Sequence, residues 1–159
     1  MRKRLKMADE SWHAGRVKPT AIQRWRRLNR PRRALLVEAM GAVCAACLSV
    51  KLLPFLWAIR LSAKPSPRPL PDRRVETLSD VRWAIDAATR HLPWNPVCIQ
   101  RGLAAQWMLR RRGIDARLHY GLTRDDAEAL RAHVWVEARG EIFVGEEDAG
   151  HYVRVATFP

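Results

Sequence analysis

The chain has 159 residues, about the size of one ordinary domain, and its 48% apolar and 28% charged residues are typical of a globular protein rather than a disordered one. The net charge of +13 lies in one half: residues 1–74 hold 18 Lys and Arg against 4 Asp and Glu, whereas residues 75–159 hold 11 against 12. The three cysteines lack a disulfide-scaffold spacing and no secretory signal precedes them, so we expect a cytoplasmic protein.

The beginning of the chain is basic. Residues 1–19 are polar and without periodicity, which predicts a mobile tail. Residues 20–63 are expected to form an N-terminal helical subdomain, which opens with a short basic helix over 20–30 and restarts at Pro31. The charge of this half suits nucleic acid, an anionic membrane, an acidic peptide or a solvated helical face, and charge alone does not separate these alternatives.

A long apolar stretch over 32–61 is a candidate membrane span. Glu38 and Lys51 interrupt it and leave 12 uncharged residues between them, fewer than the roughly 20 that a membrane-spanning helix needs. Pro54 interrupts it again. We therefore expect two helices packed on the protein, with peripheral membrane contact as the alternative.

Cys44 and Cys47 form a Cys-x-x-Cys motif inside this apolar stretch. A redox or zinc site needs polar or basic neighbours or a second ligand pair, and neither is close in the sequence. The motif therefore predicts two small apolar core residues, and we expect neither a metal nor a cofactor.

Residues 64–74 are the predicted linker, because four prolines within eight residues favour an extended spacer. The catalytic part is expected over 75–159. It begins with a helix that starts at a capping-box pattern, Thr77-x-x-Asp80, carries one apolar stripe and ends before Pro93.

Cys98 lies where a proline-marked approach turns into a helix. Asn95 is a favoured N-cap residue and Pro96 is favoured at the first helical position, which places Cys98 third in the helix. There a thiolate would face unsatisfied backbone N–H groups and the positive end of the helix dipole, and the same groups could hold an oxyanion. The helix is expected to run to Arg110–Arg112 with Gly113 as its C-terminal cap. A buried structural cysteine is the alternative.

Alternating sequence predicts three strands, over 115–123, 132–138 and 141–146. Arg139 and Gly140 are expected to form a two-residue hairpin turn between the last two strands.

That turn fixes a testable strand register. His133 then lies opposite Glu146 on one face of the sheet, where the carboxylate would orient the imidazole. A bulge would bring Gly145 or Glu147 opposite His133 instead. The pattern predicts Cys98 as nucleophile, His133 as base and Glu146 as orienting acid, and His119 on the preceding strand is the rival base.

The order of a cysteine at a helix start, a histidine on a strand and an acid on the next strand is similar to the transglutaminase-like branch of the papain-type cysteine enzymes. The chain resembles in particular the stand-alone leader peptidases of lasso-peptide biosynthesis. The resemblance lies in Leu92-Pro93-Trp94-x-x-x-Cys98, in 109–118, and in Ala132-His133-Val134-Trp135-Val136-Glu137 with Gly145-Glu146.

That resemblance implies an α+β fold, with the nucleophile helix packed on a small antiparallel sheet behind an N-terminal helical subdomain. It assigns Cys98 and His133 as nucleophile and base, with Glu146 standing where the family usually has Asp. The implied reaction is removal of the leader from a ribosomally made precursor peptide, after which a separate cyclase closes the macrolactam.

Some relatives carry a winged-helix leader-recognition domain, but residues 1–74 have too little strand pattern to form one. The resemblance therefore implies a separate leader-recognition protein, and the basic half would dock that protein, the cyclase or the precursor. No nucleic-acid-binding fingerprint is present, so no nucleic-acid partner is expected. Two alternatives remain: an acyltransferase with the same fold, and a non-catalytic basic binding module.

Overall fold

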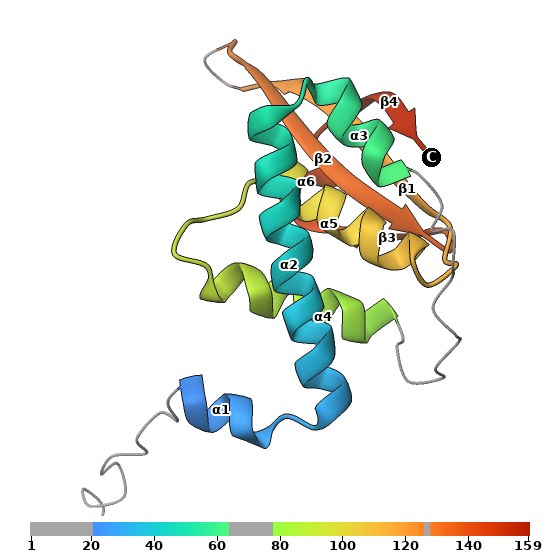
Figure 1. The fold of residues 1–159 in the computed structure, drawn as a ribbon. Coiled ribbons are helices and arrows are strands. Elements are labelled where there is room, and N and C mark those ends of the chain that lie inside the picture. Colours follow the sequence, from blue (N-terminus) through green and yellow to red (C-terminus); the bar gives the residue numbers. More distant parts are fainter. Residues whose placement is uncertain (1–20, 64–77, 126–127) are drawn as a thin grey trace, which may run out of the picture.

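A four-stranded antiparallel sheet and the helices packed against it form the structure, a computed structural model that describes residues 21–63, 78–125 and 128–159 (Figure 1). This arrangement confirms the expected α+β class. The predicted tail at 1–19 and the predicted linker at 64–74 lie outside the described residues.

The helices are α1 (Ala21–Arg27), α2 (Arg30–Leu52), α3 (Phe55–Ala63), α4 (Leu78–His91), α5 (Cys98–Arg110) and the short α6 (Glu146–Ala149). The strands are β1 (Ala116–Arg124), β2 (Leu130–Ala138), β3 (Glu141–Val144) and β4 (Val153–Phe158), in the spatial order β3-β2-β1-β4. The sequence predicted the first three strands but not β4, which pairs with β1 at the edge of the sheet.

Prolines divide the N-terminal helices as expected. Asn29 caps α2 by accepting the backbone N–H of Arg32 at 3.0 Å, with Pro31 in the first turn. Pro54 separates α2 from α3 and its carbonyl accepts the N–H groups of Trp57 and Ala58. The division of the apolar stretch into two helices is therefore confirmed.

The core is continuous from α2 to the sheet. α2 packs on α4 and α5, and α3 packs on α5, so side chains of both N-terminal helices join the same buried cluster as those of α4, α5 and the strands. The buried residues of α2 are Leu35, Leu36, Ala39, Val43, Ala46 and Cys47. The helices before the predicted linker therefore share one hydrophobic core with the elements after it.

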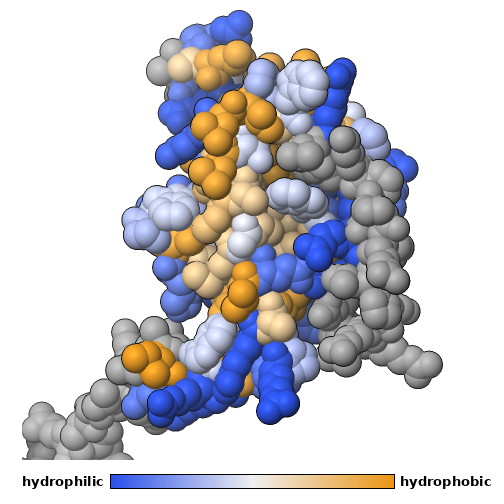
Figure 2. Space-filling view, in the orientation of Figure 1, coloured by the Kyte–Doolittle hydropathy of each residue, from blue (hydrophilic) through white to orange (hydrophobic). Residues whose placement is uncertain are grey.

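The other face of α2 is apolar and exposed. Val37, Leu48 and Leu52 are exposed, and Figure 2 shows apolar surface along this part of the molecule. By length and composition α2 is a candidate membrane span, and it is the one helix among the described residues that meets this criterion. A core helix passes the same test, and the buried stripe of α2 is what a core helix presents.

A glycine sets the distance between α5 and the sheet. A Cβ on Gly102 would lie 2.9 Å from Val134 Cγ1 and 3.5 Å from Leu118 Cδ1, so the helix can rest on β1 and β2 only without that atom. One turn later, the Gln106 amide donates to the carbonyls of Ala116 (3.2 Å) and Pro159 (3.0 Å). Between Gly102 and Gln106 the contacts of α5 therefore shift toward Ala116 at the beginning of β1, which pairs with the end of β2. In the opposite direction, the first turn of α5 lies toward the beginning of β2.

The far end of α5 is closed by a glycine and an ion pair. Gly113 has φ of +71° and Ile114 donates to the Leu109 carbonyl at 3.1 Å, which confirms the predicted C-terminal cap. Arg112 then donates to both carboxylate oxygens of Glu38 on α2, at 3.1 and 2.7 Å. This bidentate pair joins the two helices.

The hairpin turn is the one expected, but the strand register is not. Arg139 and Gly140 both have positive φ, and Ala138 pairs with Glu141 as predicted. A bulge then shifts the register, and Val136 pairs with Val144.

An arginine of α4 supports this bulge. Arg82 donates to the carbonyls of Phe143 (2.7 Å) and Ile142 (2.8 Å), and its guanidinium lies 5.7 Å from the centre of the Phe143 ring. β3 ends at Val144, and Glu146 begins α6 instead of continuing the strand. The predicted strand pairing of His133 with Glu146 is therefore wrong.

Candidate active site

Cys98 is the first residue of α5. Val97 is the N-cap in an extended conformation, and its N–H donates to the Gln100 side-chain oxygen at 3.0 Å. Asn95 and Pro96 lie before the helix, so the expected helix start at Pro96 is wrong by two residues. The cap contact comes from a residue inside the first turn rather than from Asn95, and this places the thiol at the opening of the helix.

Two backbone N–H groups at this end of the helix, those of Cys98 and Ile99, have no hydrogen-bond acceptor among the described residues. The N–H groups of Gln100 and Arg101 both donate to the Val97 carbonyl. Within the described part of the chain, no hydrogen bond occupies the N–H groups of Cys98 and Ile99. Beside the half-buried Cys98 side chain, these groups can stabilise an oxyanion formed by attack of the thiolate on a carbonyl.

The structure brings Cys98 and His133 to the same end of the sheet. Cys98 and Gly102 are four residues apart and therefore share a helix face. Gly102 rests on Val134, the residue that follows His133 in β2. The first turn of α5 consequently lies over the beginning of β2.

The His133 imidazole is held by a backbone carbonyl. Its Nε2 lies 3.1 Å from the Gly145 oxygen, and because a carbonyl only accepts, Nε2 carries the proton and Nδ1 is the basic nitrogen of the neutral ring. The ring centre lies 5.0 Å from that of Tyr152 and 6.2 Å from that of Trp135.

The two side chains are not joined in this structure. Val134 faces α5, so alternation along β2 directs the His133 ring to the other face of the sheet. No hydrogen bond links the thiol of Cys98 to the imidazole among the residues that the structure describes. Direct proton transfer therefore requires a change of side-chain orientation, and catalytic contacts commonly tighten only when substrate binds.

Glu146 does not contact His133 through the sheet. Its side chain is 67% exposed, and Oε2 lies 3.6 Å from Nη2 of Arg82. Gly145 lies at the imidazole instead: with φ of +85°, it would place a Cβ 3.0 Å from His133 Nε2 and 2.8 Å from the Val134 oxygen. The carbonyl of Gly145 thus occupies the orienting position that the sequence assigned to a carboxylate. The signal in the sequence was the glycine directly before Glu146, because glycine adopts positive φ most readily.

His119, the rival base, is buried. It is 2% exposed, with Nδ1 hydrogen-bonded to Thr157 Oγ1 at 2.9 Å and Nε2 3.2 Å from Glu137 Oε2. Burial lowers the pKa of His119, Glu137 opposes that shift, and Arg154 adds to it. A neutral histidine enclosed in this way supports the sheet and has no access to Cys98 or to solvent.

A cavity adjoins the first turn of α5. It has a volume of about 270 Å³ and lies between Trp94 and Gln100 on one side and α2 on the other, where Cys44, Cys47, Leu48 and Lys51 line it. The Trp94 indole donates to Cys47 Sγ at 3.4 Å. The Cys-x-x-Cys motif therefore lines the α2 side of this cavity, where Cys47 is buried as expected but Cys44 is only partly buried. Across the described residues no cluster of His, Cys, Asp or Glu could hold a metal ion.

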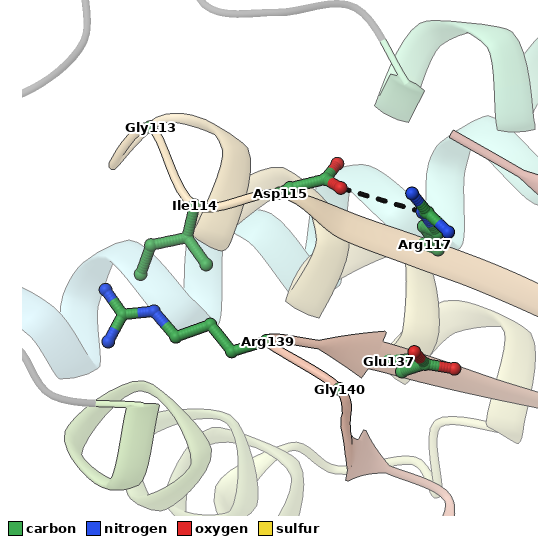
Figure 3. A pocket seen from close by; sticks show the side chains of 7 residues that line it. All are labelled: Gly113, Ile114, Asp115, Arg117, Glu137, Arg139 and Gly140. Carbon is green, nitrogen blue, oxygen red and sulfur yellow. Dashed lines mark ion pairs between the residues drawn. The ribbon is translucent and has the colours of Figure 1, made fainter.

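A second cavity, of about 320 Å³, lies at the opposite end of α5 (Figure 3). It opens between the α5–β1 connection at Ile114 and the hairpin at Arg139, and Asp115 and Arg117 form an ion pair at 3.6 Å on its wall. It contains no nucleophile and is separate from the Cys98 end.

Residues 42–157, more than half of the chain, match the family described as the Transglutaminase-like superfamily. The match begins within α2 and therefore extends across the predicted linker. Comparison with curated proteins and with solved structures finds no match. Members of the superfamily are typically cysteine peptidases or acyltransferases. With its α+β fold and a thiol at the start of the helix that packs on the sheet, the chain belongs to the transglutaminase-like superfamily.

Proposed function

We propose that this protein is a cysteine peptidase that removes the leader from a ribosomally synthesised precursor peptide during lasso-peptide maturation. The observation that carries the proposal is the position of Cys98 at the opening of α5. There it lies beside backbone N–H groups that have no partner in the described part of the chain, over the beginning of the strand that carries His133. The superfamily supports the chemistry, and the resemblance of the segments around Cys98 and His133 supports the substrate.

In this mechanism the thiol of Cys98 gives its proton to Nδ1 of His133. The resulting thiolate attacks the scissile carbonyl carbon, and the N–H groups of Cys98 and Ile99 stabilise the oxyanion. The carbon–nitrogen bond breaks, and the leaving amine takes a proton from Nδ1 of His133. Water then attacks the thioester and gives a proton to His133. The leader departs as a carboxylate and the thiol is restored. Before the reaction Gly145 holds the ring through the Nε2–H bond, and the ring must turn from this position to reach Cys98.

A separate leader-recognition protein would deliver the leader, a cyclase would take up the freed amine, and all would act in the cytoplasm.

The test is mass spectrometry of a candidate precursor incubated with the protein and its leader-binding partner. The wild type should release the leader as a free carboxylic acid, and Cys98→Ala should release none while remaining folded. Cys44→Ala is the matched control, because it removes a thiol of the same kind from the cavity wall, and it should still cleave.

Two results would contradict the proposal. Cleavage by Cys98→Ala at the wild-type rate would exclude this thiol as nucleophile. A leader attached to an amine rather than released as an acid would show acyl transfer, the alternative chemistry of the superfamily.

A further inference from the structure

An apolar groove of about 580 Å³ lies away from Cys98, between the first two helices and α4. Trp25 of α1 and Leu28, the residue after α1, line one side of the groove. Met40 of α2 and Trp83 of α4 also line it. Ile22 stands at the rim, 68% exposed. A groove with two tryptophans and a flexible methionine is suited to apolar side chains of a bound partner.

The groove is held open by an arginine. Arg33 of α2 donates to the carbonyls of Trp25 (3.1 Å) and Arg26 (2.7 Å), which end α1, and its guanidinium lies 6.0 Å from the centre of the Trp25 ring. These contacts add to the bonds at the end of the short helix, where the Trp25 carbonyl also accepts the Leu28 N–H at 3.1 Å. α1 is thereby fixed at an angle to α2 instead of closing onto α4.

The surroundings of the groove are strongly basic. The acidic residues of α2 and α4 are each paired with an arginine, in the pairs Glu38–Arg112, Asp80–Arg32 and Asp86–Arg101. Arg90 lines the groove, and Arg26, Arg27 and Arg30 lie exposed at the end of α1 and the start of α2. Within the described part of the chain no acidic side chain pairs with these four arginines. Their field favours an anionic partner.

We propose that this groove binds an acidic peptide segment with apolar residues, which fill the space between Trp25 and Trp83 while its carboxylates face Arg90 and the arginines of α1. Charge argues against the chain itself as occupant, because residues 1–20 and 64–77 are both basic and a second copy would bring another net +13. Shape argues against a bilayer, which is flat, whereas these apolar side chains line a concave space. This inference does not depend on the proposed peptidase activity.

Direct binding to the full-length Cys98→Ala protein tests it. The probe is a fluorescein-labelled amphipathic peptide of Glu and Leu, followed by fluorescence anisotropy, and its partner probe carries Lys in place of every Glu. The Glu peptide should bind saturably, at least about tenfold more tightly than the Lys peptide, and its affinity should fall as salt rises.

Two acidic substitutions at exposed apolar positions locate the site. Ile22→Glu at the groove rim should lower the affinity for the Glu peptide about tenfold, because it adds a negative charge where the negatively charged peptide enters. Val37→Glu, on the part of α2 outside the groove, should leave the affinity within about twofold.

Several results would overturn the proposal: no saturable binding, equal affinity for the Glu and Lys peptides, or equal loss in Ile22→Glu and Val37→Glu. Displacement of the peptide by phosphatidylserine vesicles, with vesicle binding lost in Ile22→Glu, would assign the groove to a membrane instead.

Discussion

The two ends of α5 differ in how completely their backbone groups are satisfied, although Nη1 of Arg110 in the last turn is buried without a hydrogen-bond partner among the described residues. At the C-terminal end, Arg112 is 7% exposed and makes two hydrogen bonds to Glu38, and Gly113 ends the helix with a left-handed turn. At the N-terminal end, Gln100 caps the Val97 N–H, and no group of the described residues accepts a hydrogen bond from the N–H groups of Cys98 and Ile99.

The C-terminal end of α5 therefore contributes mainly to stability, whereas the N-terminal end carries the candidate nucleophile. The C-terminal end fixes α5 to α2 with a closed ion pair, and the Arg101–Asp86 ion pair holds the beginning of the helix to α4 without using the N–H groups of the first turn. The first turn can then keep a thiol and unsatisfied N–H groups, which would be a cost if the whole helix depended on them. Substitutions at the two ends should therefore have different consequences.

The largest expected effect on stability is at the C-terminal end. Arg112→Met leaves the Glu38 carboxylate without its main partner in a half-buried position, which should lower the free energy of unfolding by about 3–5 kcal/mol. Urea denaturation measures it. Peptidase activity per folded molecule should be unchanged, because Cys98 is at the other end of α5.

Arg111→Met is the matched control. Arg111 lies 3.9 Å from the same carboxylate but is half exposed, so its loss should cost no more than about 1 kcal/mol. Equal destabilisation by the two substitutions would contradict the account of the C-terminal end.

Substitution of Gly145 should lower stability less than Arg112→Met does, but it should lower activity specifically. Gly145→Ala adds a Cβ 3.0 Å from His133 Nε2 and 2.8 Å from the Val134 oxygen, which should displace the imidazole and lower kcat/KM about tenfold or more. Gly140→Ala has a similar positive φ of +83° but nothing within 4 Å of the new Cβ. It therefore reproduces the backbone strain without the clash.

Peptide cleavage kinetics of both variants, with unfolding curves, separate strain from displacement. Gly140→Ala should lose stability but keep kcat/KM. If Glu146→Gln abolished activity while Gly145→Ala preserved it, the carboxylate rather than the glycine carbonyl would be the orienting group.

The smallest expected effect is a pH dependence of stability from His119. Burial lowers the pKa of His119 below its ordinary value of 6.5, so protonation favours the unfolded state. The contribution of the neutral ring is complete above pH 6.5 and is lost as pH falls through the lowered pKa in the folded state. His119→Gln should therefore reduce the loss of stability between about pH 7.5 and about pH 5.

Urea denaturation at both pH values measures this difference. His91→Gln is the control, because His91 is exposed and should leave the pH dependence of the wild type in place. Identical pH dependence in the wild type and His119→Gln would show that the buried imidazole does not titrate with unfolding.

Local signals in the sequence predicted the local features of the fold. The proline-separated helices, Gly113 as a cap and the Arg139–Gly140 turn all follow from backbone preferences of single residues, and all are confirmed. The position of Cys98 near a helix start also followed from such signals, although the helix begins two residues later because Gln100 supplies the cap contact.

Features set by distant contacts were missed. The bulge that moves Gly145 rather than Glu146 to His133 is supported by Arg82, which lies 61 residues from Phe143 in the chain. β4 was missed because it is an edge strand with exposed Val153 and Val155, so its alternation does not mark a buried face. The catalytic assignment of Cys98 and His133 stays a prediction that chemistry must test.

The most direct test is the rate at which iodoacetamide alkylates each cysteine as a function of pH, followed by peptide mass spectrometry. At about pH 6 we expect Cys98 to be alkylated faster than Cys44 and Cys47. We expect His133→Ala to lower the alkylation rate of Cys98 at least about tenfold, whereas His119→Gln should leave that rate unchanged. An unchanged Cys98 rate in His133→Ala, or a Cys98 rate no higher than that of Cys44, would contradict the assignment of these two residues as nucleophile and base.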